Sequence, residues 1–178
     1  SVPFVVFGLN IGNEISSVSV DLKKAQYQLT KSVLKKQITD IVFFGGDKKY
    51  CYSQFKFLGY QQAMEQAGLS AQFYKSGNLY IFEEGYHAAL EYLRTHKKPQ
   101  CIMAVNDIVA CGALKALREL QLSDIMVTGF DGIKVEGLTD DAMPTVVVPL
   151  EEMAQKVIDI LNSRQLKICE VSPKIRCS

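Results

Sequence analysis

The chain has 178 residues, of which 48% are hydrophobic and 22% charged, the composition of an ordinary soluble globular protein. This length suffices for one substantial α/β domain, or for one lobe and part of another. The 20 basic and 19 acidic side chains leave a formal net charge of +1, without the basic excess of a self-sufficient nucleic-acid-binding domain. No apolar run approaches the roughly 20 residues that a membrane span needs. We therefore expect neither DNA contacts by these residues nor a membrane segment.

The cysteines favour a reducing compartment. There are five of them, Cys51, Cys101, Cys111, Cys169 and Cys177, and no pair has the C-x-x-C spacing. An odd number without that spacing predicts free thiols rather than a disulfide or zinc framework. The two histidines lie in no ligand-like cluster. We expect a cytoplasmic protein that holds no metal ion and no other cofactor.

Strand-like and helix-like segments alternate along the chain. Residues 3–8, Pro-Phe-Val-Val-Phe-Gly, open it with a short apolar run that predicts a buried strand. Because a buried strand needs neighbours on both sides, we expect further chain upstream. Residues 9–20 are polar and predict a loop. Further strands are predicted at 40–45, 71–75, 100–104, 125–129 and 145–148, helices at 21–36, 53–67, 83–95, 107–120 and 150–162, and a strand-like core in the tail 167–177.

This alternation predicts βαβ units, and hence a largely parallel, doubly wound sheet with helices on both faces. In such open sheets, ligands bind at the carboxyl ends of the strands. The side chains that follow those ends in the sequence therefore form the candidate site. They are Tyr50, Tyr52, Lys56, Leu79, Tyr80, Asn106 and Asp131.

The chemistry of this set suits a polyol or sugar better than a phosphate. Amides and carboxylates hydrogen-bond hydroxyl groups, and tyrosine rings stack on the apolar faces of sugars. Each residue also has a purely structural interpretation, which the sequence leaves open. Asp107 could serve simply as the N-cap of its predicted helix, Asn106 could be a turn residue, and Asp131 could form an Asx turn. The tyrosines could be surface aromatics, and Lys56 could simply be solvated.

Signatures of enzymes are missing from the sequence. The first strand is not followed by G-x-G-x-x-G, and there is neither a phosphate loop nor a G-x-S-x-G nucleophile elbow. No cysteine stands in a recognisable catalytic sequence, and two histidines offer few general bases. These features predict a binding protein rather than an enzyme.

Several segments together resemble the LacI/GalR repressor family. The most specific is Ala-Val-Asn-Asp at 104–107, continuing to Ala-Cys-Gly-Ala-Leu at 110–114. Val-Thr-Gly-Phe-Asp at 127–131 is nearly as specific. Each match alone is weak, but all follow the family's order and spacing over essentially the whole chain. The others lie at 2–6, 20–21, 41–46, 56–60, 63–64, 68–69, 145–149 and 174–178.

The resemblance implies a periplasmic-binding-protein type I fold, which has two similar α/β subdomains with a sugar cleft between them. It assigns residues 1–20 to the end of the N-terminal subdomain and the crossover, and 21–145 to the C-terminal, effector-binding subdomain. Residues 146–163 would form a returning helix of the N-terminal subdomain, and 164–178 a C-terminal strand and tail. The helix-turn-helix and most of the N-terminal subdomain would lie outside this chain.

The resemblance also implies the site and the partners. Effector contacts fall at Asn106, Asp131, Lys56 and the Leu79/Tyr80 position. Lys56 replaces the family's arginine and so lacks its bidentate fork, which favours a small neutral sugar over an anionic purine-like effector. The implied protein is a homodimer that binds operator DNA through its N-terminal domain. Residues 25–27 and the tail most resemble sucrose-utilisation repressors.

Two other functions stay open at this point. An extracytoplasmic sugar-binding protein of a transporter shares the implied fold, and a signal peptide in place of a helix-turn-helix would distinguish it. The second is an α/β enzyme such as a nucleotide-dependent transferase, which turnover or nucleotide binding would reveal. The cysteine pattern favours the repressor over the first, and the missing motifs argue against the second.

Overall fold

The computed structural model describes residues 4–75, 80–134 and 143–177. The chain forms two compact units, each considered separately below. The large unit comprises Leu22–Val147 and Ile175–Ser178, and the small unit comprises Ser1–Asp21 and Val148–Lys174. None of the helices in the described ranges combines the length and apolar character that crossing a bilayer requires.

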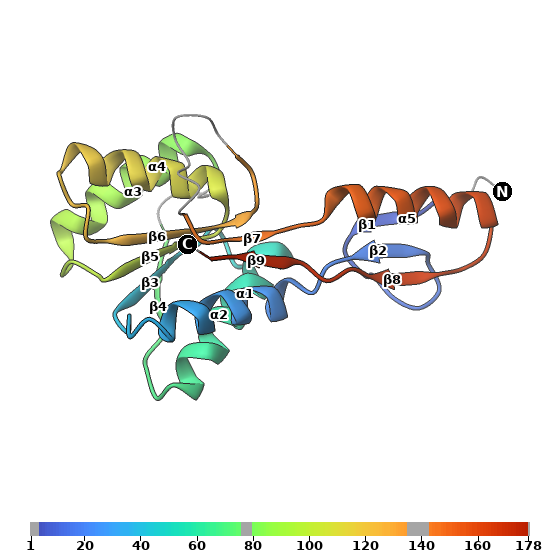
Figure 1. Ribbon diagram of the computed structural model, residues 1–178, viewed down its shortest axis with the longest axis horizontal. Helices are drawn as coiled ribbons and strands as arrows, with labels where there is room; N and C mark the ends of the chain where they lie inside the picture. The colour runs from blue at the N-terminus through green and yellow to red at the C-terminus, as the bar shows by residue number, and fades with distance from the viewer. Residues whose placement is uncertain (1–3, 76–79, 135–142, 178) are drawn as a thin grey trace. The chain divides into compact units, whose positions relative to one another are not determined.

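The large unit is built on a six-stranded sheet with the order β4-β3-β5-β6-β7-β9 (Figure 1). From β4 to β7 every neighbouring pair is parallel. The strands do not follow chain order, so the connections cross over as expected for βαβ units. The strands are β3 (Ile41–Phe44), β4 (Gln72–Tyr74), β5 (Cys101–Ala104), β6 (Met126–Asp131), β7 (Thr145–Val147) and β9 (Lys174–Arg176).

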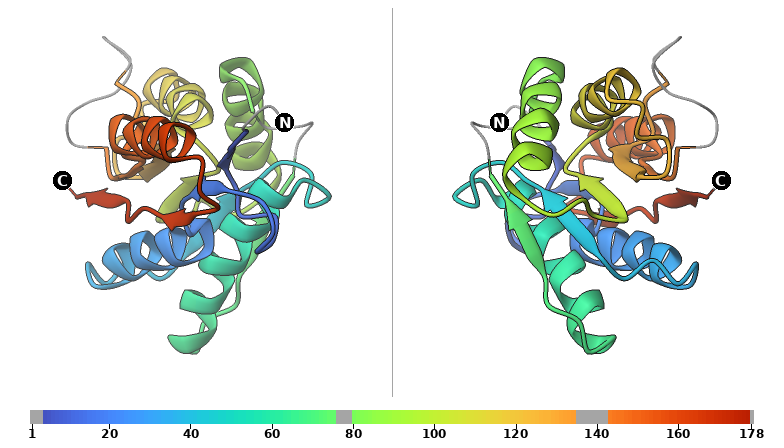
Figure 2. Two further views of the ribbon diagram at one scale, coloured as in Figure 1. Left: turned by 90° about the vertical axis from the view of Figure 1, so that its right-hand side faces the viewer. Right: turned by 90° about the vertical axis from the view of Figure 1, so that its left-hand side faces the viewer.

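Helices cover both faces of this sheet, so the predicted doubly wound α/β fold is confirmed. Helices α1 and α2 pack together on one face, and α3 and α4 pack together on the other (Figures 1 and 2). All four helices were predicted within a few residues of their observed bounds. Those bounds are α1 Leu22–Leu34, α2 Cys51–Gln66, α3 Phe82–Thr95 and α4 Asp107–Glu119.

Alternation along β3 shows how the sequence fixes this layering. Successive side chains of a strand point to opposite faces. The Phe43 ring lies 5.9 Å from the Phe57 ring of α2, whereas the Phe44 ring lies 5.5 Å from the Tyr92 ring of α3. Both phenylalanines are fully buried. A strand that is apolar on both faces therefore demands a helical layer on each side.

The small unit holds a three-stranded sheet with the order β1-β2-β8, and both pairs are parallel. Its strands are β1 (Val6–Gly8), β2 (Ser17–Ser19) and β8 (Ile168–Glu170), and its helix is α5 (Leu150–Ser163). Among the described residues, α5 packs against β2.

One prediction for this unit was wrong. Residues 9–20 were expected to form a loop, but residues 17–19 form the fully buried central strand β2. Ser-Val-Ser is too short and too polar to show a strand pattern, and its pairing partner β8 lies some 150 residues away in the chain. The strand predicted at 3–8 is present as β1, which within these 178 residues lies at the edge of its sheet with Phe7 49% exposed.

Candidate functional site

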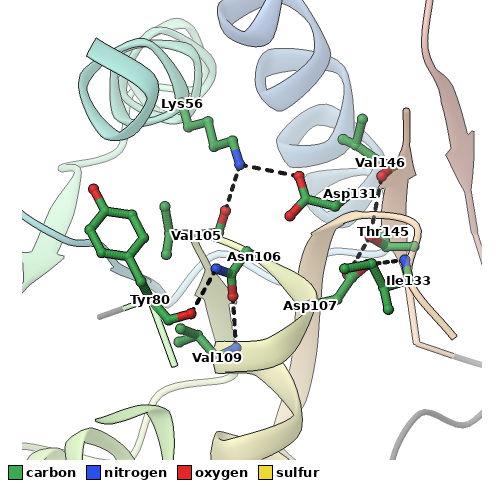
Figure 3. A network of polar contacts seen from close by, with 10 residues as sticks. All are labelled: Lys56, Tyr80, Val105, Asn106, Asp107, Val109, Asp131, Ile133, Thr145 and Val146. Atoms are coloured by element: carbon green, nitrogen blue, oxygen red, sulfur yellow. Dashed lines mark hydrogen bonds and ion pairs between the residues drawn. The ribbon is translucent and has the colours of Figure 1, made fainter. Parts of the chain in front are cut away.

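Polar side chains converge at the carboxyl ends of β5 and β6 (Figure 3). Asn106 follows β5, and Asp131 is the last residue of β6. Lys56 reaches them from α2, the helix that follows β3. Because β3, β5 and β6 are adjacent and parallel, their ends meet at the same edge of the sheet. The structure thus brings together three of the predicted site residues.

Lys56 links the two strand ends. Its Nζ donates a hydrogen bond of 2.9 Å to the Val105 carbonyl oxygen and lies 3.6 Å from Asp131 Oδ1. It also lies 3.9 Å from the centre of the Phe130 ring, a cation–π distance. The Lys56 side chain is only 7% exposed, whereas that of Asp131 is 39% exposed. Solvent therefore reaches the carboxylate of this pair far more readily than the ammonium.

Burial acts against the charge on both partners. It lowers the pKa of Lys56 and raises the pKa of Asp131, while the attraction between the two groups opposes both shifts. The opposite formal charges cancel within the pair. The pair therefore offers a hydrogen-bonding carboxylate oxygen to solvent but no uncompensated cation for an anion.

Asn106 caps helix α4. Its Oδ1 accepts a hydrogen bond of 2.7 Å from the Val109 N–H, and its Nδ2 donates one of 3.2 Å to the Tyr80 carbonyl oxygen. A side-chain amide has two N–H groups and two acceptor lone pairs, and these contacts use one of each. One N–H and one lone pair of the amide therefore remain while Asn106 holds α4 and the segment before α3 in place.

Asp107 does not have the capping role that the sequence suggested for it. It is the first residue of α4 and is fully buried. Its Oδ1 accepts a hydrogen bond from Thr145 Oγ1 and its Oδ2 one from the Ile133 N–H, both at 2.6 Å. Burial raises its pKa to about 6, although these hydrogen bonds act in the opposite direction.

Asp107 and its partners were missed as functional candidates. Thr145 lies 38 residues further along the chain, so no local spacing points to the contact. The one available signal was an aspartate at a strand end directly after Asn106, which the helix-start pattern explained equally well.

Two tyrosines border the polar network. The Tyr50 and Tyr80 rings lie 6.2 Å apart at 74°, an edge-to-face arrangement. Tyr50 is 48% exposed, so its ring is accessible to a ligand. Tyr52, in the first turn of α2, is 41% exposed and takes no part in the contacts drawn in Figure 3. Leu79 lies outside the described residues.

Other features of the large unit do not belong to this site. A cavity of about 710 Å³ lies at the opposite, amino end of the sheet, where Gln100, Asp124 and Pro144 are among its lining residues. None of the candidate residues lines it. Groups of His, Cys, Asp and Glu suited to a metal ion are absent from the described part of the chain. All five cysteines are free thiols.

The fold and the site define the class of protein. The family of periplasmic binding protein-like domains matches residues 30–168, most of the chain, and the chain belongs to this family. Two proteins with related sequences are bacterial regulators. The HTH-type transcriptional regulator RegA of Clostridium saccharobutylicum is 27% identical over 85% of this chain and 48% of that protein. The ribose operon repressor of Escherichia coli K12 is 28% identical over 76% of this chain and 42% of that protein.

Solved structures agree on the fold. A crystal structure of an uncharacterized protein from Actinobacillus succinogenes superposes with a TM-score of 0.87 at 28% identity, over 98% of this chain and 67% of that one. The E. coli transcriptional repressor AscG superposes with a TM-score of 0.86 at 24% identity, over 97% of this chain and 67% of that one. The chain spans about half the length of the curated relatives that it matches. These sequence relatives are transcriptional regulators, not enzymes.

Proposed function

We propose that this chain is the effector-sensing part of a LacI-type bacterial transcriptional repressor, and that its effector is a small neutral sugar. The observation that carries the proposal is the partly exposed Asp131 carboxylate near the Asn106 amide at one edge of the sheet. Asn106 bonds the Tyr80 backbone, and the Tyr80 ring contacts the exposed Tyr50 ring. Carboxylate and amide groups hydrogen-bond hydroxyls, and an exposed tyrosine ring packs on the apolar face of a sugar.

The charge balance of the site favours an uncharged effector. Lys56 is buried and paired with Asp131, so an anionic ligand would have to separate the pair or approach a carboxylate. A lysine in this position also lacks the planar fork with which arginine binds a carboxylate or phosphate. In this proposal Asp131 and Asn106 contact hydroxyl groups. Lys56 was predicted to contact the effector, but in this proposal it orients the Asp131 carboxylate through their ion pair.

The regulatory role rests on the relatives. We propose a cytoplasmic homodimer that binds operator DNA through a helix-turn-helix domain outside these 178 residues. The sugar would bind more tightly to one conformation of the protein and shift the population toward it, which changes operator affinity. An extracytoplasmic transport component is the less favoured function, because the curated relatives named above are regulators.

Calorimetry tests the proposed sugar site. The full-length protein is titrated with sucrose, D-ribose, D-glucose and cellobiose, and the sugar that binds most tightly is then used with variants. Asp131→Ala removes a charge-assisted hydrogen bond of about 1.5–3 kcal/mol, so affinity is expected to fall at least about tenfold. Asp124→Ala is the matched control, because this exposed aspartate pairs with Lys98 at the other end of the sheet. Equal affinities for the two variants would remove Asp131 from the site.

A further inference from the structure

The buried carboxylate of Asp107 joins three elements of the large unit. Asp107 itself begins α4, Thr145 begins β7, and Ile133 follows the end of β6. One oxygen of the carboxylate bonds Thr145 Oγ1 and the other bonds the Ile133 N–H, so both oxygens are engaged (Figure 3). A fully buried charge is costly unless such partners satisfy it. With no exposed surface, Asp107 itself cannot contact a ligand.

The turn that Asp107 holds has an unusual backbone. Asp131 has φ +111° and Gly132 has φ +80°, backbone angles that residues other than glycine rarely adopt. A non-glycine residue in such a conformation is kept there only when its surroundings fix it. The Ile133 N–H, two residues after Asp131, is tied to Asp107 at 2.6 Å. On the other side, Asp131 is paired with Val147 in the register of β6 with β7.

A close approach of the backbone makes this contact possible. Gly129 lies on β6 opposite Thr145, and a Cβ atom on residue 129 would overlap the Asp107 carboxylate. The glycine therefore leaves room for a carboxylate against the strand that carries Asp131. Thr145 is itself fully buried, so a water molecule from solvent cannot replace Asp107 as the partner of its hydroxyl group.

We propose that Asp107 is a positioning residue for effector binding, which fixes the strained turn at 131–133 and thereby the direction of the Asp131 carboxylate. This inference rests on the proposed function, since it requires Asp131 to contact the sugar. Asp107 acts only through Asp131: the Thr145 and Ile133 bonds hold the turn, and the turn holds the carboxylate beside Lys56.

Thr145 provides the mildest way to weaken this arrangement. Thr145→Val keeps the shape of the side chain but removes the hydroxyl that bonds Asp107, whereas Thr145→Ser keeps the hydroxyl. Asp107→Asn is the stronger variant, because its amide group can no longer accept at both positions. Sugar affinity of the full-length protein is expected to fall about tenfold in Thr145→Val, by more than that in Asp107→Asn, and to stay within about twofold of wild type in Thr145→Ser.

A double-mutant cycle separates positioning from general support of the fold. In the Asp131→Ala background, Thr145→Val is expected to change affinity less than about twofold, because the group that it positions is gone. An equal loss in both backgrounds would overturn the inference, and so would unchanged affinity of Thr145→Val in the wild-type background. Unchanged affinity of Asp131→Ala alone would instead refute the proposed role of Asp131 itself.

Hydrogen exchange provides a test that needs no ligand. Amide exchange in peptides that cover residues 131–134 is expected to be about tenfold faster in Thr145→Val than in Thr145→Ser, with β3 and β5 unchanged. Equal exchange in the two variants would overturn the inference whatever the sugar results. Faster exchange together with no binding of sucrose, D-ribose, D-glucose or cellobiose would refute the proposed sugar function, and with it the positioning role, while leaving the contact itself established.

Discussion

The two units differ in how completely they cover their sheets. In the large unit helices lie on both faces, and Phe43, Phe44 and Phe130 are among the fully buried side chains. The small unit packs one helix, α5, against a sheet of three-residue strands. Among the described residues it holds seven of the fourteen exposed large hydrophobic side chains, although it is much the smaller unit. Within these 178 residues, the small unit therefore leaves a larger share of its apolar side chains exposed than the large unit does.

The units also differ in the polar groups that they bury. The buried polar residues of the small unit are Ser16, Ser17 and Ser19. The large unit buries two charged side chains, Lys56 and Asp107, at the candidate site. A core must be well formed before it can hold charges in fixed positions, since each needs partners to offset its loss of water. The two buried charges of the candidate site therefore lie in the unit whose sheet has helices on both faces.

Truncation of matched phenylalanines provides the largest test of this contrast. Phe43→Ala should lower the free energy of unfolding by about 3–5 kcal/mol, because the ring is fully buried against other aromatic rings. Phe7→Ala, at a position 49% exposed in the small unit, should cost less than about 1 kcal/mol. Urea denaturation, monitored by circular dichroism, measures the free energy of unfolding of both variants. Similar losses would show that the half-exposed Phe7 ring contributes as much to stability as the fully buried Phe43 ring.

The pH dependence of stability is expected to arise partly from the charge buried in the large unit. Because burial raises the pKa of Asp107 to about 6, the folded state holds its proton more tightly than the unfolded state. The free energy of unfolding should therefore fall as the pH rises from about 4 to about 6. Asp107→Asn lacks this proton, so its deficit relative to wild type should shrink by about 1–3 kcal/mol between pH 4 and pH 7. Parallel pH profiles for the two proteins would contradict a raised pKa.

The smallest expected effect lies on helix α5 and sharpens the comparison within the small unit. Ile158 is 51% exposed and Ile160 is 4% exposed on the same helix. Ile158→Ala should change the free energy of unfolding by less than about 0.5 kcal/mol. Ile160→Ala, the matched variant, should cost about 2 kcal/mol or more if α5 packs tightly. Equal, small effects would mean that the small unit has no effective core.

Much of the large unit could be predicted from the sequence, because its elements carry strong local signals. Apolar runs such as 41–44 and 101–104 are bounded by turn residues, and the helices α1, α3 and α4 have a clear periodicity, which α2 lacks. The rule that parallel sheets bind ligands at their carboxyl ends then selected Asn106, Asp131 and Lys56, which the structure brings together. Short strands without a pattern, such as β2, were beyond this approach because distant pairing creates them.

For the large unit, the amino-acid sequence by itself determined the order of strands and helices, the layers around the main sheet and the edge at which polar groups gather. These follow from hydrophobic periodicity, which is a local property of the chain. Only the tertiary structure decided that Asn106 rather than Asp107 caps α4, that Lys56 is buried beside Asp131, and that Asp107 bonds Thr145 and Ile133. Those roles depend on contacts between residues far apart in sequence, and a buried charge takes whichever partners the folded chain brings to it.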